Sequence, residues 1–500
     1  MDRRIATVFF TLLLGAPCLA HVGSPDVYFQ GDAGPYHLAV MIRTPQMIPG
    51  VAEIEIRSST PEVRDVKIVP LYIVGPGSKY PPPPDVLQPS KDDPQFFAGK
   101  LWLMASGSWQ VRIEADGDRG AGKLAVPVPA FARNTRPMQR DLGALLTGLL
   151  ILLVLAIVSI LGAARREGQL EPGQPSGLAQ MRAARVAMAV ALVIVLGILS
   201  LGGWWWKVAA AERVRLMIYR PPELFASLLP GGKLLLRVGE SSWHTRRMEA
   251  VSTKLIPDHG HLMHLFLIRV PQMDRFYHLH PSEDKGGVFL DDLPPISAGH
   301  YQIFADIVRE SGFPDTLVAK MDIPEIAGDP LAGDDSAANA PALSPDAAGN
   351  VDFLLPDGAR MVWERQPGPL AANQLLWFRF HVQDAAGKAV TDLEPYMGMA
   401  GHAEFVRSDL SVFAHVHPDG SASMAAVELA QASLPGNSKE PPASAESAMR
   451  GMEMSGMHAG AAPAAVAFPY GFPKPGLYRI FVQIKRAGHV ETGVFDTWVK

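Results

Sequence analysis

Residues 413–418 read Phe-Ala-His-Val-His-Pro, and they repeat residues 276–281, which read Phe-Tyr-His-Leu-His-Pro. A further histidine begins an apolar run 13 or 14 residues before the first histidine of each motif: His402 in one copy and His264 in the other. Two more pairs of segments match in the same order: 234–238 with 376–380, and 299–304 with 476–481. Because this order is kept throughout, we predict a tandem repeat whose alternating apolar and polar residues form strands.

The whole chain is predicted to be mainly β, with three β-sandwich domains and a hairpin of two transmembrane helices. Its 500 residues are too many for one core, and the 46 glycines and 44 prolines are typical of short strands joined by turns. The predicted parts are a signal peptide (1–20), a first sandwich (21–132), two membrane spans (142–164 and 186–206) joined by a cytoplasmic loop (165–185), a second sandwich (213–325), a linker (327–349), and a third sandwich (351–500) with a low-complexity, Met-rich insertion (425–465).

The membrane hairpin rests on two apolar stretches that carry no charge and exceed 20 residues each. Three tryptophans end the second stretch, where an aromatic belt is expected. Arg3, Arg4 and the small residues before position 21 predict a secretory signal, which would remove Cys18, the one cysteine of the chain. We therefore expect an inner-membrane protein with two spans and all three sandwiches on the periplasmic side.

The repeated histidines are candidate metal ligands. Alternation along a strand places His415 and His417 on one face, and a two-residue turn at 409–410 would put His402 opposite His417. Three imidazoles would then lie within reach of one ion. In the other copy, His264, His278 and His280 are spaced one residue further apart, which a bulged turn would absorb. The alternative is that such histidine pairs are structural strand residues, as we expect for His244, His300, His381 and His489.

The residues near these histidines favour copper. Met397 and Met399 precede His402, and His259 and His261 precede His264. Thioether and imidazole ligands suit copper, Cu(I) above all, better than calcium, magnesium or manganese, and zinc would gain nothing from methionine. The insertion carries a cluster that resembles the Met-rich Cu(I)-binding loops of exported copper-resistance proteins: Met449, Met452, Met454, Met457 and His458.

The exported domains resemble the YtkA-like and FixH-like family through Gly401-His402 and the two His-x-His-Pro motifs. This resemblance implies small immunoglobulin-like sandwiches and copper handling outside the inner membrane. His21, at the expected cleavage point, is similar to the N-terminal histidine of CopC-type periplasmic copper proteins, and its amine and imidazole would chelate Cu(II). The first sandwich has no Asp-x-His partner for it.

These observations lead us to expect a membrane-anchored copper-binding protein that sequesters the ion or transfers it to an acceptor or transporter protein. A net charge of −5 and a pI near 6.3 give no reason to expect a nucleic-acid partner. One alternative is a metalloenzyme with a three-histidine site, although the chain has no G-x-S-x-G or H-E-x-x-H motif. The other is an adhesion or scaffold protein with structural histidines. We favour a protein that is not an enzyme.

Overall fold

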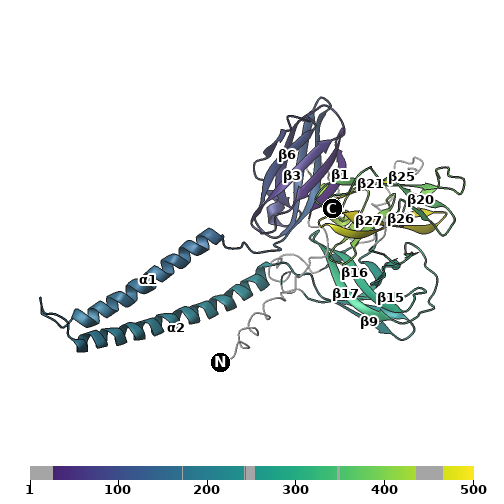
Figure 1. Cartoon of the computed structure of the whole chain (residues 1–500). Coiled ribbons are helices and arrows are strands. Elements are labelled where there is room, and N and C mark those ends of the chain that lie inside the picture. Colours follow the sequence, from purple (N-terminus) through teal and green to yellow (C-terminus); the bar gives the residue numbers. More distant parts are fainter. Residues whose placement is uncertain (1–25, 172, 241–242, 244–253, 346–348, 435–464) are drawn as a thin grey trace. The chain divides into compact units, whose positions relative to one another are not determined.

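The computed structural model describes residues 26–434 and 465–500, apart from 172, 241–242, 244–253 and 346–348 (Figure 1). Strands dominate and two long helices interrupt them. The prediction of a mainly β chain with sandwich domains and two apolar helices is therefore confirmed. The chain divides into two compact units, of which Ala132–Tyr219 contains the helices and the remainder contains the sandwiches.

The two helices are α1 (Arg140–Glu167) and α2 (Leu178–Met217). Both are long and apolar enough to cross a membrane. In the most apolar 18-residue stretch of each helix, only 6% is buried. Helical structure extends beyond the predicted apolar stretches because alanine, arginine and glutamate continue it at low cost. Gly168 and Gly177 end and begin the helices, so the connection is residues 168–177, shorter than the expected loop.

The first sandwich is a sheet in the order β1-β2-β3-β6-β5-β4-β7-β8, wrapped around one core. Strand β5 pairs with both β4 and β6 and so joins the two halves. The strands are β1 (Val27–Ala33), β2 (Tyr36–Arg43), β3 (Gly50–Ser58), β4 (Val63–Tyr72), β5 (Asp85–Pro89), β6 (Phe96–Leu103), β7 (Gly107–Gly117) and β8 (Gly120–Ala130), with a 3-10 turn at Pro76–Lys79.

The second sandwich pairs the sheet β14-β15-β10-β9 with the sheet β11-β16-β12-β13-β18, to which β17 adds beside β16. Apolar side chains of the two sheets meet in one core. The strands are β9 (Leu224–Leu229), β10 (Lys233–Val238), β11 (Leu255–Ile256), β12 (His264–Val270), β13 (Arg275–Leu279), β14 (Ser282–Lys285), β15 (Val288–Asp292), β16 (Gly299–Arg309), β17 (Pro314–Ile323) and β18 (Ser336–Asn339).

The third sandwich repeats this plan. Its sheet β22-β26-β23-β24, with β27 beside β26, has the strand order of β11-β16-β12-β13 with β17. A second sheet, β19-β20-β21-β25, covers the other side of its core. The strands are β19 (Asp352–Leu354), β20 (Arg360–Trp363), β21 (Leu376–Gln383), β22 (Leu393–Glu394), β23 (His402–Arg407), β24 (Phe413–Val416), β25 (Ala465–Tyr470), β26 (Gly476–Arg486) and β27 (His489–Val499).

A tight turn recurs ahead of the first histidine of each copy. Residues 258 and 261 bridge across one turn, and residues 396 and 399 bridge across the other. The first central residue has a positive φ in both, 51° at His259 and 50° at Met397, and a glycine follows at 86° and 80°. Two consecutive positive φ values are typical of the type I′ turn. Met397 therefore stands in the third sandwich where His259 stands in the second.

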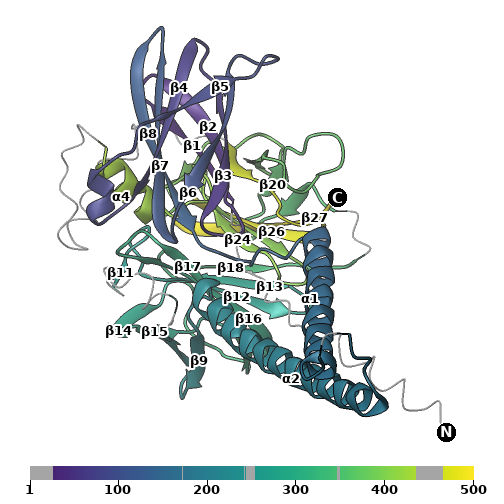
Figure 2. The same ribbon diagram turned by 90° about the vertical axis from the view of Figure 1, so that its left-hand side faces the viewer.

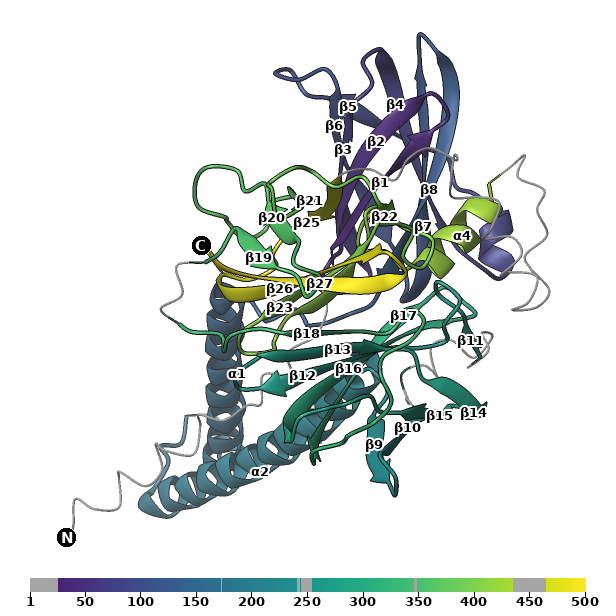
Figure 3. The ribbon, with the colours of Figure 1, turned by 90° about the vertical axis from the view of Figure 1, so that its right-hand side faces the viewer.

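The two repeated sandwiches pack through equivalent faces. The sheet containing β23 and β26 lies on the sheet containing β12, β13 and β16 (Figure 3). Phe276 stacks on Phe481 with ring centroids 4.2 Å apart, and Phe304 stacks on Phe413 at 4.3 Å. Because Phe276 matches Phe413 and Phe304 matches Phe481 in the repeat, each contact is the counterpart of the other. The interface thus resembles that of a two-fold symmetric dimer, formed within one chain.

Two segments that we expected to be irregular contain regular structure. Within the expected linker, Ser336–Asn339 forms strand β18, which pairs with β13 at the edge of the second sandwich. The start of the expected low-complexity insertion is helix α4 (Met424–Ala432), which lies beside β8 of the first sandwich (Figure 2). Ala430 and Leu434 pack there on Ala125. Tertiary packing on small residues explains both, because neither segment has a strong periodic pattern of its own.

Candidate metal centre

Eight histidines gather where the second and third sandwiches meet. Each ring centroid lies between 4.0 and 6.1 Å from those of its histidine neighbours. The eight are His259, His261, His264, His278, His280, His402, His415 and His417. They are the six histidines of the two repeated motifs together with the two in the turn at 258–261. The repeat therefore brings together residues that are far apart in sequence.

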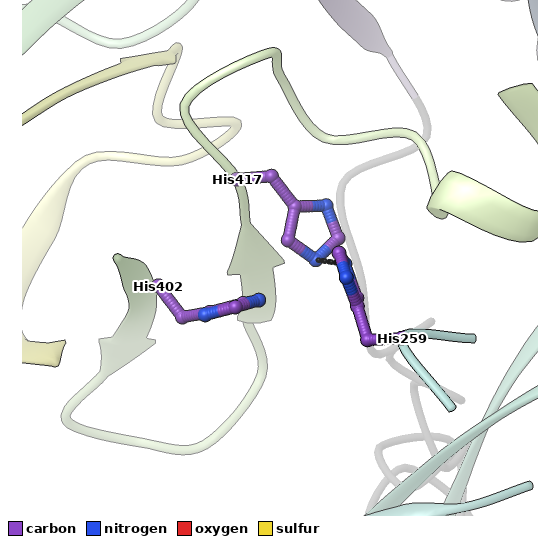
Figure 4. A group of neighbouring side chains, drawn as sticks. All are labelled: His259, His402 and His417. Carbon is purple, nitrogen blue, oxygen red and sulfur yellow. Dashed lines mark hydrogen bonds between the residues drawn. The ribbon is translucent and has the colours of Figure 1, made fainter. Parts of the chain in front are cut away.

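Three of these residues form what we call the inter-domain triad: His259, His402 and His417. One ring nitrogen of each lies within 4.8 Å of the others, and all three residues are buried (Figure 4). His402 begins β23 and His417 directly follows β24, and the pairing of Ala403 with Val416 sets them opposite each other as the sequence spacing predicts. The third histidine comes from the turn of the second sandwich, in place of the predicted His415.

His264, His278 and His280 form a second set, which we call the second triad, and the same limit of 4.8 Å holds for its nitrogens. The pairing of Leu265 with Leu279 places His264 opposite His280. The additional residue in this copy is taken up at the turn that follows β12, where Met273 has a φ of 51°. No register shift interrupts the β12–β13 pairing. These three residues are the set that the sequence predicts for this copy.

The ring protons of the inter-domain triad can be assigned from their partners. His259 directs Nδ1 at the carbonyl oxygen of Met397, 2.9 Å away, and His417 directs Nδ1 at that of Ala422, 3.2 Å away. Carbonyl oxygens only accept, so both Nδ1 atoms carry the proton in the neutral rings. The two Nε2 atoms then face each other at 3.2 Å with lone pairs alone. Two facing acceptors repel unless a cation lies beside them.

The second triad repeats this arrangement. Nε2 of His264 faces the carbonyl oxygen of Asp258 at 3.0 Å, and Nδ1 of His278 faces Oε1 of Gln483 at 3.0 Å. The remaining nitrogens, Nδ1 of His264 and Nε2 of His278, face each other at 3.1 Å. His280 directs Nδ1 at the carboxylate of Asp335, 2.9 Å away. Oxygen acceptors that orient imidazoles in this way are typical of the surroundings of metal ligands.

His402 is the clearest case of a buried side chain whose polar atoms have no hydrogen-bond partner among the described residues. Its side chain is fully buried, and neither ring nitrogen has a partner among the residues that the structure describes. An unsatisfied buried polar group costs about 1–3 kcal/mol. Nitrogens that share an ion at about 2.0–2.1 Å lie roughly 3.3–3.6 Å apart, close to the spacing of the facing pairs. A metal ion would therefore satisfy His402 and relieve the repulsion between His259 and His417.

Burial keeps these imidazoles neutral, which is the form that binds metal. Loss of solvation and the neighbouring histidines hold the pKa values of five of them well below the ordinary value: His264, His278, His280, His402 and His417. Burial also lowers the pKa of His259. The pKa of Asp335, beside His280, is raised by burial to about 6. The imidazole nitrogens that would bind a metal ion therefore resist protonation and keep their lone pairs available.

The metal-free chain should lose stability in mild acid. In the unfolded chain the histidines titrate near pH 6.5, and in the folded chain below it. The unfolded state therefore binds more protons once the pH falls below about 6.5, and the free energy of unfolding falls with it. We expect a lower unfolding temperature at pH 5.5 than at pH 7.5 in chelator-treated protein. An equal unfolding temperature at both values would contradict this assignment, and the exposed-residue variant His300→Ala should behave like the wild type.

Two of the eight histidines lie outside the triads. His415 has its ring centroid 5.3 Å from that of His402 and 5.4 Å from that of His264. Its Nδ1 lies 3.5 Å from the carboxylate of Asp306. His261 is partly exposed, and its ring stacks on that of His280 with centroids 4.0 Å apart. Its Nε2 lies 3.4 Å from a carboxylate oxygen of Asp334. His415 therefore occupies the boundary between the triads, and His261 their outer edge.

The methionines predicted as ligands are placed differently. Met397 contacts the centre through its carbonyl oxygen, which orients His259. Met399 closes the same turn. Both are partly buried, and the described contacts do not bring either sulfur to the histidines. His21 lies outside the described residues. So do all members of the Met-rich cluster, which are Met449, Met452, Met454, Met457 and His458.

Sequence reasoning missed the groups that orient the rings. Asp258, Asp335 and Gln483 each accept from a histidine, and Glu404 is fully buried on the face that carries His402. Neither carboxyl oxygen of Glu404 has a partner among the described residues, and burial raises its pKa well above the ordinary value. The sequence signal for Glu404 is its position two residues after His402, because residues i and i+2 of a strand point to the same face.

Comparison with known proteins adds little to this description. A family described as a domain of unknown function, DUF8832, matches residues 355–500, which cover most of the third sandwich. No curated protein matches the chain. Among solved structures, the ICAM-5 D1-D4 ectodomain fragment matches at 10% identity and a TM-score of 0.15. The match covers 93% of this chain and 77% of that fragment. A TM-score this low supports no argument, so the fold rests on the sheets described above.

Proposed function

We propose that this chain is a membrane-anchored copper-binding protein whose ions sit between its two repeated sandwiches. The observation that carries the proposal is the inter-domain triad: three buried imidazoles within 4.8 Å, two with lone pairs facing each other and one with no hydrogen-bond partner among the described residues. Structural histidines would instead be expected to pair with hydrogen-bond partners. A scaffold protein has no need of such an arrangement.

Copper is favoured over other ions by the ligand set and the composition around it. Imidazole suits copper, zinc, iron and nickel, and disfavours calcium and magnesium. The Met-rich segment at 449–457 adds soft thioethers that favour Cu(I) among these. A periplasmic location, the resemblance to YtkA-like and FixH-like proteins, and transfer to an acceptor or transporter protein belong to the same proposal. They are supported by the signal-like N-terminus and by the two apolar helices.

Copper uptake by the full-length chain in detergent tests the proposal. Competition with a chromophoric Cu(I) chelator should show tight binding that falls at least a hundredfold at one site in the variant with His259, His402 and His417 all replaced by alanine. The matched control is His300→Ala, which removes an exposed histidine paired with Asp322. Zinc uptake without copper uptake would favour the three-histidine metalloenzyme instead, and uptake of neither metal would contradict both.

A further inference from the structure

The two triads are adjacent, and equivalent residues of the repeat line the boundary between them. His278 of the second sandwich corresponds to His415 of the third, and their ring centroids are 5.7 Å apart. Gln483 accepts from His278, and its counterpart Asp306 lies beside His415. The boundary thus has the same pseudo-two-fold relation as the stacked phenylalanines. His264 and His280 of the second triad correspond to His402 and His417 of the inter-domain triad, and the two triads differ in their third member.

His415 lies between the two triads, in a position to bind an ion of either one. Its side chain is 6% exposed, and its Nε2 is buried without a hydrogen-bond partner among the described residues. Its ring centroid lies 4.7 Å from that of His417 on one side and 5.4 Å from that of His264 on the other. The carboxylate of Asp306 at Nδ1 favours a proton there, which leaves the lone pair on Nε2.

We infer that the two triads are halves of a single two-ion centre and that Nε2 of His415 supplies an additional ligand to one of the two ions. This inference rests on the proposed function, because it requires that the triads bind copper at all. It adds the stoichiometry of two ions, their proximity, and a ligand that belongs to neither triad. The centre requires both sandwiches, since the inter-domain triad takes His259 from one and its other ligands from the other.

Loading the full-length chain with Cu(II) alone provides the test. We expect two copper ions per chain by elemental analysis and a half-field transition in the electron paramagnetic resonance spectrum, which arises when two Cu(II) ions are close enough to couple. The variant with His264, His278 and His280 all changed to alanine should keep one ion and lose the half-field signal. The control His300→Ala should keep both ions and the signal.

The outcomes separate the two proposals. Two bound ions with the spectrum of isolated Cu(II), or only one ion in the wild type, would overturn the two-ion centre and leave copper binding intact. No bound copper would overturn both. For His415→Ala, we expect two ions with the affinity for the weaker one reduced at least tenfold, because one ligand is lost. Unchanged affinities for both ions would show that His415 is not a ligand.

Discussion

Copper loading should raise the unfolding temperature of the wild-type chain by about 10 °C, and His259→Ala should remove a large part of that increase. A ligand that binds only the folded state at 1,000 times its dissociation constant adds about 4 kcal/mol per site. For domains of this size, 1 kcal/mol corresponds to about 2–4 °C. His259 is decisive because it is the proposed ligand that the second sandwich contributes to the inter-domain triad. Without it, an ion at His402 and His417 no longer links the two domains.

Differential scanning calorimetry with and without copper would measure this effect. The matched control is His381→Ala, a partly exposed histidine of the third sandwich that pairs with Glu364. It should keep the full copper-induced increase. If His259→Ala responds to copper as the wild type does, the ion does not bridge the sandwiches, and the inter-domain triad is not its site.

Replacing Arg479 by alanine should lower the free energy of unfolding by about 3–5 kcal/mol, because it breaks a buried ion pair and leaves a charge unpaired. Arg479 is 2% exposed on β26. Its Nε and Nη2 both donate to Asp496 at 2.7 Å, and its Nη1 donates to the carbonyl oxygens of Met273 and Pro341. One side chain therefore contacts the strand β27, a loop of the second sandwich and the segment that joins the second sandwich to the third.

Chemical denaturation of the metal-free chain would measure this loss, with Arg360→Ala as the control. Arg360 pairs with Asp352 on the surface of the same sandwich, where an ion pair contributes about 0–1 kcal/mol. Because Arg479 reaches across the interface, its loss should also weaken copper binding at the inter-domain triad. Equal stability of the two variants would contradict the role assigned to Arg479.

The pseudo-two-fold interface offers a physical reason for the tandem repeat. A single sandwich presents its histidines on one face of a sheet, where they would be solvated and mobile. Two copies packed face to face bury the same histidines and enclose them with the stacked pairs Phe276–Phe481 and Phe304–Phe413. Burial keeps the rings neutral, and the opposite copy supplies the acceptor Gln483 and the candidate ligand His259. The repeat thus produces a dimer-like site without a second chain.

Local pattern in the sequence determined which residues are strands, which stretches are long apolar helices, and which histidines share a face. His402 lies opposite His417 because strand pairing has a period of two and the turn length sets the register. The repeat was visible for the same reason: matching segments kept their order. These features depend on neighbours within a few residues or on one hairpin, which is the range over which sequence patterns are informative.

Only the tertiary structure decided how the copies face each other. Nothing in the pattern of residues 255–265 indicates that His259 completes a site 143 positions away, because that contact depends on packing between domains. The same packing moved His415 from the predicted trio to the boundary between triads, and it oriented the rings of His259 and His278 through Met397 and Gln483. The sequence alone named the candidate ligands, and the interface between the sandwiches decided which of them meet.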